Sequence, residues 1–237
     1  MNKMLEIVAK WHSIAYHSYS SARRVRELSL QVHAPMTPEE REFYLNFRCA
    51  LRGNDLVIYD IGASVGVLCG ALAKLKNVKE LHAFEPIPDS FAKLTRRMQP
   101  YPHVTCHNVA VGDEAGELAM NVVNTEHRRD SSSLLTLNKD KFESEYGGDF
   151  NNHTEKVRVI TLDNYVQEMN LSAPDVVVGD VQGYEDRVLK GGANTINKAK
   201  FLILELSLEP LYEGSPVFDD IYGVVRQMGF RLVGLGD

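Results

Sequence analysis

The chain has 237 residues, 44% of them apolar and 24% charged, which is the balance of a globular protein with one domain, or one domain and an added arm. Its net charge of −6 argues against nucleic acid as a bulk partner, because phosphate binding rests on clustered lysine and arginine. Three scattered cysteines without metal-ligand spacing predict reduced thiols and no metal site. Glu6, Lys10 and His12 interrupt the N-terminal apolar residues, and no apolar run reaches the length of a membrane span, so we expect a cytoplasmic protein.

Residues 1–52 are predicted to form a helical arm packed on the core, and residues 53–237 a ligand-binding domain. Apolar side chains at positions 5, 8, 11 and 14, and again at 25, 28 and 32, have helical spacing and predict two helices. Thr37, Pro38 and Glu40 form a capping-box pattern that begins a third helix, ending near Leu51. We favour packing of this arm on the sheet edge over the two alternatives, a lid or a homodimer contact.

A buried strand, a glycine turn and a helix are predicted between Val57 and Lys74, and we expect a ligand at the turn. The strand is apolar and closes at Asp60, and apolar residues then recur at helical spacing from position 68 to position 75. Gly62 and Gly66 bracket the turn. Glycine permits unusual backbone dihedrals and close approach of a ligand, and a helix start offers N–H donors. The alternative is a tight turn without a ligand.

Glu85 follows a second predicted strand, at residues 80–84, and precedes Pro86 and a helix with apolar positions 91, 94 and 98. The alternation of strand, helix and strand implies a parallel sheet. Glu85 stands 19 residues after Gly66, and a carboxylate at this place hydrogen-bonds the ribose hydroxyls in α/β nucleotide-binding folds. A surface glutamate without a ligand is the alternative.

Asn108 ends a third predicted strand that begins at Val104. Because the carboxyl ends of parallel strands line one crevice, we expect Asp60, Glu85 and Asn108 to converge on one elongated ligand, with Asn108 near its base. Residues 117–123 are predicted to form an antiparallel excursion. The polar stretch 124–153, which includes three serines at 131–133, is predicted to be a long loop that either covers the site or is solvated.

A second chemical cluster follows the predicted strand 175–178. Asp180 stands at its carboxyl end and is expected to point into the same crevice, unless it caps the next helix. Glu185 falls in the first turn of that helix, where the helix dipole favours negative charge. Glu205 lies near the tip of an apolar strand at 201–206, faces the crevice or its rim, and requires a partner. Further strands are predicted at 157–162 and 230–235, and helices at 163–169 and 218–228.

The turn fits some nucleotides better than others. A dinucleotide fingerprint needs three glycines, but Ser64 and Val67 stand at the second and third places, so NAD, FAD and an NAD-dependent oxidoreductase are disfavoured. ATP is also disfavoured, because a phosphate-binding loop needs a lysine directly after its turn, and the first lysine after this turn is Lys74. S-adenosylmethionine has a ribose and a base but no phosphate, and its amino group and sulfonium favour carboxylates such as Asp60.

Seven ordered blocks of the sequence resemble the FkbM-type S-adenosylmethionine-dependent methyltransferases, over about residues 55–235. The blocks are YDIGASVG, AFEPIPDSF, NVAVGDEAGEL, SSSLL, ITLDNY, GDVQGYEDRVLKGG and LELSLEPLYEG. The resemblance implies a doubly wound, Rossmann-like α/β fold with a mostly parallel sheet, of the class I methyltransferase type. Family members usually add a last antiparallel strand. Since the sequence ends at Asp237, we expect the sheet to lack that strand or to be finished differently.

The resemblance also implies which residues hold S-adenosylmethionine. They are Asp60, Gly62, Ala63, Ser64 and Gly66 for the methionine part, Glu85 followed by Pro86 for the ribose, Asn108, Val109 and Ala110 for the adenine, and Asp180 beside the reactive methyl. The family usually has a lysine where Gly179 stands and often a glutamate where Gln182 stands, so no charge role is carried over to these two positions.

A methyltransferase mainly aligns its acceptor and removes water. An alcohol acceptor must also lose its proton, which a carboxylate within hydrogen-bond reach assists. We assign this role first to Asp180, with Glu185 and Glu205 as alternatives. The resemblance implies O-methylation of a hydroxyl on a sugar, a glycan or a natural-product small molecule. An N-methyltransferase and a catalytically silent S-adenosylmethionine-binding protein are the alternatives.

Overall fold

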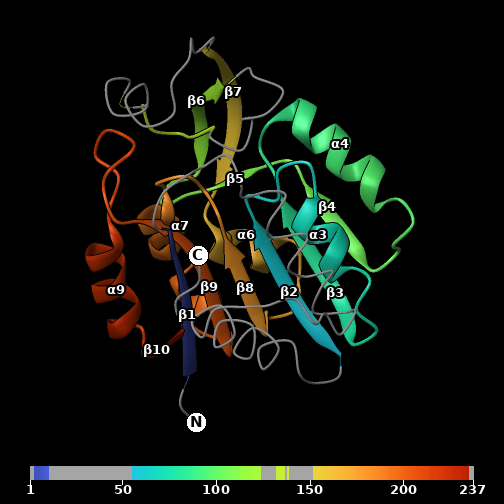
Figure 1. The fold of residues 1–237 in the computed structure, drawn as a ribbon. Coiled ribbons are helices and arrows are strands. Elements are labelled where there is room, and N and C mark those ends of the chain that lie inside the picture. Colours follow the sequence, from blue (N-terminus) through green and yellow to red (C-terminus); the bar gives the residue numbers. More distant parts are fainter. Residues whose placement is uncertain (1–2, 11–54, 124–131, 137, 139–151, 235–237) are drawn as a thin grey trace, which may run out of the picture.

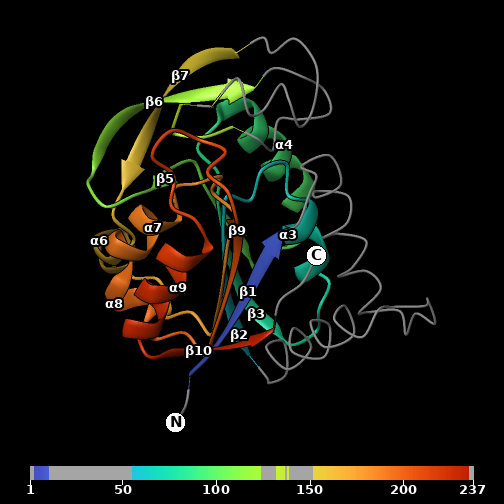
Figure 2. The ribbon, with the colours of Figure 1, turned by 60° about the vertical axis from the view of Figure 1, so that its left-hand side comes forward.

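The computed structural model describes residues 3–10, 55–123, 132–136, 138 and 152–234, and these form a layered α/β fold (Figure 1). The central layer is a seven-stranded sheet with the order β10-β1-β9-β8-β2-β3-β4, in which neighbouring strands are parallel. Figure 2 views this sheet nearly edge-on and shows helices on both of its faces. The predicted doubly wound, mostly parallel fold is confirmed.

The strands of this sheet are β1 (Lys3–Lys10), β2 (Leu56–Ile61), β3 (Val78–Phe84), β4 (Val104–His107), β8 (Val176–Gly179), β9 (Phe201–Ser207) and β10 (Phe230–Gly234). The helices are α3 (Val67–Leu72), α4 (Pro88–Met98), α6 (Leu162–Glu168), α7 (Glu185–Gly191), α8 (Ala193–Ile196) and α9 (Phe218–Gln227). Helices α3 and α4 cover one face, and α6 to α9 cover the other (Figure 2).

Strand β2 shows why the sheet is so apolar. All six of its residues are buried, because both faces of a central parallel strand are covered by helices. Successive side chains alternate between the two hydrophobic cores: Tyr59 and Ile61 pack toward α6 to α9, whereas Ile58 packs toward α3 and α4. Strand β2 pairs in parallel with both β3 and β8. The residues that follow these three strands therefore lie at one edge of the sheet.

A second, three-stranded sheet lies beyond the carboxyl ends of the large one (Figure 2). It consists of β5 (Ala110–Val111), β7 (Asn152–Ile160) and β6 (Gly116–Val123), in that order. Strands β6 and β7 are antiparallel, which confirms the predicted excursion after the third strand, and an isolated bridge joins Asn121 to Ser133. The small sheet therefore stands over the edge where the ligand was predicted.

The prediction of a helix across residues 3–10 is wrong, because this segment is strand β1. It pairs in parallel with both β9 and β10, with Leu5 opposite Leu202 and Leu232. Backbone pairing with two strands that lie some 200 residues away in the sequence outweighs the local helical spacing of the apolar residues here. The other helices predicted within residues 1–52 lie outside the described residues. Strand β1 also decides how the sheet is finished, since β10 joins it through β1 and runs parallel.

Two buried histidines on neighbouring strands form a polar chain inside the apolar core. His82 Nδ1 lies 3.1 Å from His107 Nε2, and His107 Nδ1 lies 3.2 Å from the Tyr165 hydroxyl. Phe84 stacks on the His107 ring with centroids 4.6 Å apart. Burial, reinforced by repulsion from His82, lowers the pKa of His107 to about 4 from an ordinary value of 6.5.

The buried, hydrogen-bonded His107 predicts that the protein loses stability in mild acid. Because the folded-state pKa of His107 lies below its unfolded value, the unfolded chain binds the proton first as the pH falls from 6.5 to 4. Relative to His107→Gln, the free energy of unfolding of the unaltered protein should fall by about 3 kcal/mol between pH 7 and pH 4. Urea unfolding across this range measures it. His153→Gln, at an exposed histidine, should leave the slope unchanged. Equal slopes for His107→Gln and the unaltered protein would contradict the prediction.

Candidate functional site

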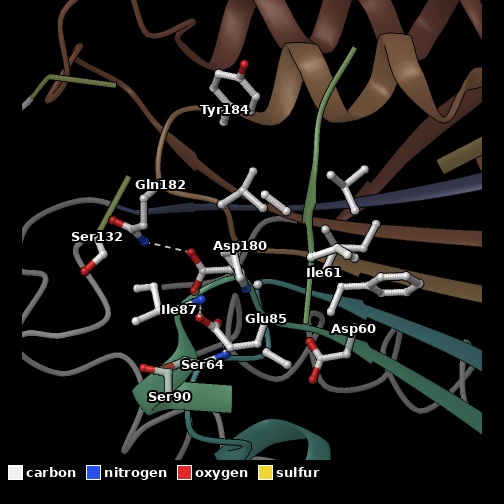
Figure 3. A pocket seen from close by; sticks show the side chains of 18 of the residues that line it. Asp60, Ile61, Ser64, Glu85, Ile87, Ser90, Ser132, Asp180, Gln182 and Tyr184 are labelled. Carbon is white, nitrogen blue, oxygen red and sulfur yellow. Dashed lines mark hydrogen bonds between the residues drawn. The ribbon is translucent and has the colours of Figure 1, made fainter. Parts of the chain in front are cut away.

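A pocket lies at the carboxyl ends of β2, β3 and β8, between the large sheet and the small one (Figure 3). The predicted ligand-binding residues that line it are Asp60, Gly62, Ala63, Ser64, Glu85, Pro86, Val109, Ala110 and Asp180. Gly66, Asn108, Glu185 and Glu205 are not among its lining residues. The structure therefore brings together most of the residues that the sequence singled out, and it gives the remainder other positions.

The turn after β2 packs directly against the loop after β8. Gly62 has a φ of 88°, and a Cβ built on it would lie 1.9 Å from the carbonyl oxygen of Asp180. The Asp180 amide also donates to the Ile61 carbonyl at 2.9 Å. Only glycine permits this approach, so Asp180 sits at the same end of the pocket as the glycine turn.

The amides of the turn are bound within the protein. Gly62 and Ala63 both donate to the Phe84 carbonyl at 3.0 Å, and Gly66 donates to the Ala63 carbonyl at 2.8 Å. Gly66 has a φ of 78° and precedes α3, where a Cβ would lie 2.6 Å from Leu94 Cδ1. Gly66 thus allows α3 to pack on α4, and these three amides do not point at a ligand as the N–H groups of a phosphate-binding loop do.

Glu85 is the polar residue that joins the glycine turn to the next loop. It is 4% exposed, and its carboxylate accepts hydrogen bonds from the Ser64 amide at 2.9 Å and the Ile87 amide at 2.8 Å (Figure 3). Asn108 is exposed, and its side-chain amide donates to the carbonyls of Glu85 and Pro86 at 2.9 and 3.0 Å. Asn108 therefore supports the Glu85 loop rather than lining the pocket as predicted.

Asp60 carries the unusual electrostatics of the site. It is 3% exposed, and its Oδ2 has no hydrogen-bond partner among the described residues. Burial raises the pKa of this carboxyl to about 7 from 3.8, because the ionised form loses its hydration. A buried carboxyl that lines a pocket and lacks a partner is suited to bind a hydrogen-bond donor or a cation from a ligand.

Asp180 lines the pocket next to the glycine turn and accepts a hydrogen bond from Gln182. Gln182 Nε2 lies 2.7 Å from Asp180 Oδ1 (Figure 3) and 3.5 Å from Glu205 Oε1. Gln182 lines the pocket and Glu205 does not. Glu205 is therefore connected to the site through its contact with Gln182. The sequence identified Asp180 but not the role of its neighbour.

Glu185 lies beneath this loop rather than in the pocket. It is 3% exposed, and its Oε1 accepts from the amides of Val181 and Gly183, each at 3.3 Å. Burial raises the pKa of the Glu185 carboxyl to about 7, and the nearby Glu205 adds to the shift. These hydrogen bonds stabilise the loop that contains Val181 and Gly183. The Glu185 carboxylate therefore does not lie in the pocket, which a catalytic group would have to reach.

One wall of the pocket is apolar and comes partly from the small sheet. Met120 of β6 packs in one buried cluster with Ile87, Ala110 and Val159, and Leu134 packs against that cluster. Among these, Met120, Leu134 and Ile87 line the pocket and were not identified from the sequence. Met120 reaches the pocket through the pairing of β6 with β7, which no local motif indicates.

Ser132 and Ser133 show that part of the polar segment does cover the pocket. Both are buried, Ser132 lines the pocket, and Ser133 donates from Oγ to the Gln182 carbonyl at 2.7 Å. Most of the predicted loop 124–153 lies outside the described residues. Within the described part of the chain, no cluster of histidine, cysteine, aspartate or glutamate is arranged to hold a metal ion. No helix among the described residues is long and apolar enough to cross a bilayer.

The doubly wound sheet and the position of the pocket define the class of this protein. In open α/β sheets, ligands bind in the crevice at the carboxyl ends of the strands, which is where Asp60, Glu85 and Asp180 meet. A family model described as the methyltransferase FkbM domain matches residues 60–232. The chain belongs to this family and is a methyltransferase, as the ordered sequence blocks predicted.

Two named methyltransferases are similar to this chain. The 2-O-methyltransferase NoeI of Sinorhizobium fredii strain NGR234 is 28% identical over 198 residues, which cover 82% of this chain and 80% of NoeI. The hexuronic acid methyltransferase AglP of Haloferax volcanii is 26% identical over 157 residues, which cover 64% of this chain and 56% of AglP. A crystal structure of a precorrin 8w decarboxylase from Methanobacterium thermoautotrophicum matches 85% of this chain and 77% of its own with 14% identity and a TM-score of 0.38.

The contact between Gly62 and Asp180 predicts a severe effect of one added methyl group. Gly62→Ala places Cβ inside the Asp180 carbonyl at a positive φ and should lower the free energy of unfolding by at least about 3 kcal/mol. Chemical denaturation measures this change. Gly223→Ala, in α9 with nothing within 4 Å of the added Cβ, should leave stability equal or up to about 1 kcal/mol higher. Equal stability of the Gly62→Ala and unaltered proteins would contradict the close packing.

Proposed function

We propose that this protein binds S-adenosylmethionine in the pocket and transfers its methyl group to a hydroxyl of a sugar or a related natural-product small molecule. Membership of the FkbM methyltransferase family supports the reaction class. The names of two relatives, a 2-O-methyltransferase and a hexuronic acid methyltransferase, support an oxygen nucleophile and a sugar acceptor. S-adenosylmethionine, the methyl donor of this family, must also fit the side chains of this pocket.

The observation that carries this proposal is Asp60 Oδ2, which has no hydrogen-bond partner among the residues that the structure describes. A buried acceptor at the glycine turn matches the amino group of the donor's methionine part. Glu85 is fixed by two backbone amides at the end of β3, where a carboxylate meets ribose hydroxyls. Ile87, Ala110 and Met120 supply an apolar wall for the adenine ring. The turn provides no lysine and no free amides at Gly62, Ala63 or Gly66 for a phosphate, which agrees with a donor that lacks one.

Asp180 is the group that we assign to the acceptor. In the reaction, the acceptor oxygen bonds to the methyl carbon, the carbon–sulfur bond pair stays on sulfur, and the hydroxyl proton leaves. Asp180 lines the pocket at the glycine-turn end and orients the acceptor hydroxyl or takes its proton. Glu185 and Glu205 no longer compete for this role, because neither lines the pocket. Burial of the surrounding residues excludes water, which would otherwise solvate the nucleophile.

The raised pKa of Asp60 predicts pH-dependent binding of the donor. The ligand's ammonium group favours the ionised carboxylate, so binding below pH 7 must first displace a proton. The affinity for S-adenosylhomocysteine, measured by calorimetry, should rise roughly tenfold or more from pH 5.5 to pH 7.5 and then level off. Asp60→Asn should bind more weakly at pH 7.5 and lose this rise. Glu185 titrates in the same range outside the pocket and remains in both proteins as an internal control. A rise of equal size in Asp60→Asn would contradict the assignment.

The sugar assignment predicts which acceptors turn over. Release of S-adenosylhomocysteine is measured with a panel of methyl glycosides, comprising neutral hexosides, a 6-deoxyhexoside, an N-acetylhexosaminide and a hexuronide, and the O-methyl product is located by NMR. At least one glycoside should be methylated on oxygen. Asp180→Asn should still bind S-adenosylhomocysteine within about twofold of the unaltered protein and lose turnover about a hundredfold. Methylation of amines alone would contradict the proposal, as would full turnover by Asp180→Asn.

A further inference from the structure

The Gln182 side chain lies between two carboxylates that come from different elements. Its Nε2 donates to Asp180 Oδ1 at 2.7 Å, on the loop after β8, and lies 3.5 Å from Glu205 Oε1 on β9. Figure 3 shows Gln182 beside Asp180 at the rim of the pocket, joined to it by this hydrogen bond. A side-chain amide is the neutral group that can donate to both carboxylates at once.

Tyr212 and the two carboxylates together determine which way this amide points. The Tyr212 hydroxyl donates to Gln182 Oε1 at 3.0 Å, and the tyrosine is 3% exposed. The two carboxylates accept hydrogen bonds, so they direct the amide nitrogen Nε2 toward Asp180 and Glu205, and the Tyr212 hydroxyl, which can donate or accept, then donates to Oε1. A flipped amide would place its oxygen against two carboxylates and its nitrogen against the hydroxyl.

Specific contacts also hold the backbone at Gln182. Gln182 has a φ of 53° and is followed by Gly183 with a φ of 92°, where a Cβ would lie 2.9 Å from Ser215 Cβ. The Gln182 carbonyl accepts from the buried Ser133 Oγ at 2.7 Å. Non-glycine residues adopt a positive φ at a cost, so the surrounding contacts must stabilise this conformation. This backbone conformation sets the direction in which the glutamine side chain leaves the main chain, and the hydrogen bonds of the amide hold its end.

We propose that Gln182 is the positioning residue for Asp180: with its amide oxygen bound by Tyr212, it holds the Asp180 carboxylate at the methyl-donor end of the pocket. This inference rests on the proposed function, because it places the sulfonium next to Asp180. The placement follows from Gly62, whose turn contacts the Asp180 backbone, so the donor's methionine part and Asp180 share one end of the pocket.

The test compares affinities for two ligands that differ by one methyl group and one positive charge. S-adenosylmethionine carries the sulfonium and S-adenosylhomocysteine does not, so the ratio of their dissociation constants reports how closely Asp180 faces the sulfur. Gln182→Met keeps the length of the side chain and removes its donor. We expect it to weaken S-adenosylmethionine binding relative to S-adenosylhomocysteine by at least threefold, with affinity for the latter within twofold of the unaltered protein.

Tyr212→Phe and a matched control complete the design. Tyr212→Phe should shift the same ratio by a smaller factor and should add nothing in the Gln182→Met background, because both changes act through one hydrogen-bond chain. Gln167→Met, at an exposed glutamine of α6, should leave the ratio unchanged. With a glycoside acceptor from the panel, Gln182→Met should lower kcat about tenfold and leave the acceptor KM within twofold.

Each outcome of the calorimetry is decisive. An unchanged ratio in Gln182→Met would overturn the positioning role, and so would equal losses of affinity for both ligands, which indicate general support of the pocket. Independent, additive effects of Gln182→Met and Tyr212→Phe would overturn the chain between them. If the unaltered protein bound neither ligand, the proposed function itself would fail, which distinguishes that failure from a failure of the positioning role alone.

Discussion

The close packing of the Gly62 turn on the Asp180 backbone is the constraint on which the rest of the site depends. It follows from strand pairing, because β2 and β8 are neighbours with Ile61 opposite Gly179, and the chain therefore leaves both strands at the same level. The next residues can meet only if one of them lacks a side chain, and a Cβ at Gly62 would lie 1.9 Å from the Asp180 carbonyl oxygen. A glycine in a turn is usually discussed for its backbone freedom, but here it also brings two chemical loops into contact.

The acidic residues around the pocket are distinguished by their partners rather than by their type. Glu85 is held by two backbone amides and joins two loops, while Glu185 accepts from the amides of its own loop. Asp180 accepts from a side-chain amide, and Asp60 Oδ2 has no partner among the described residues. Three of the four thus have their interactions supplied by the protein. From this difference we infer that Asp60 is the carboxylate available to a ligand and that Asp180 is the one whose direction the protein sets.

Much of this arrangement is predictable from sequence, because it depends on local patterns. The turn at Gly62, the acid at position 85 and Asp180 all follow apolar strands, and parallel strands bring such positions to one edge. The errors arise where long-range contacts decide. Strand β1 has apolar residues that also suit a helix, and its pairing with β9 and β10 is not visible locally. Met120 reaches the pocket through the small sheet, and whether Glu185 faces the pocket or its own loop depends on the backbone at residues 181–183.

A crystal structure with S-adenosylhomocysteine bound would show whether this pocket holds the methyl donor with its sulfur beside Asp180. The expected placement has the amino group at Asp60, the ribose hydroxyls at Glu85, the adenine against Met120 and Ile87, and the sulfur next to Asp180. A nucleoside bound in the reverse direction, with adenine at Asp60, would contradict it. Binding outside the edge formed by β2, β3 and β8 would contradict it equally.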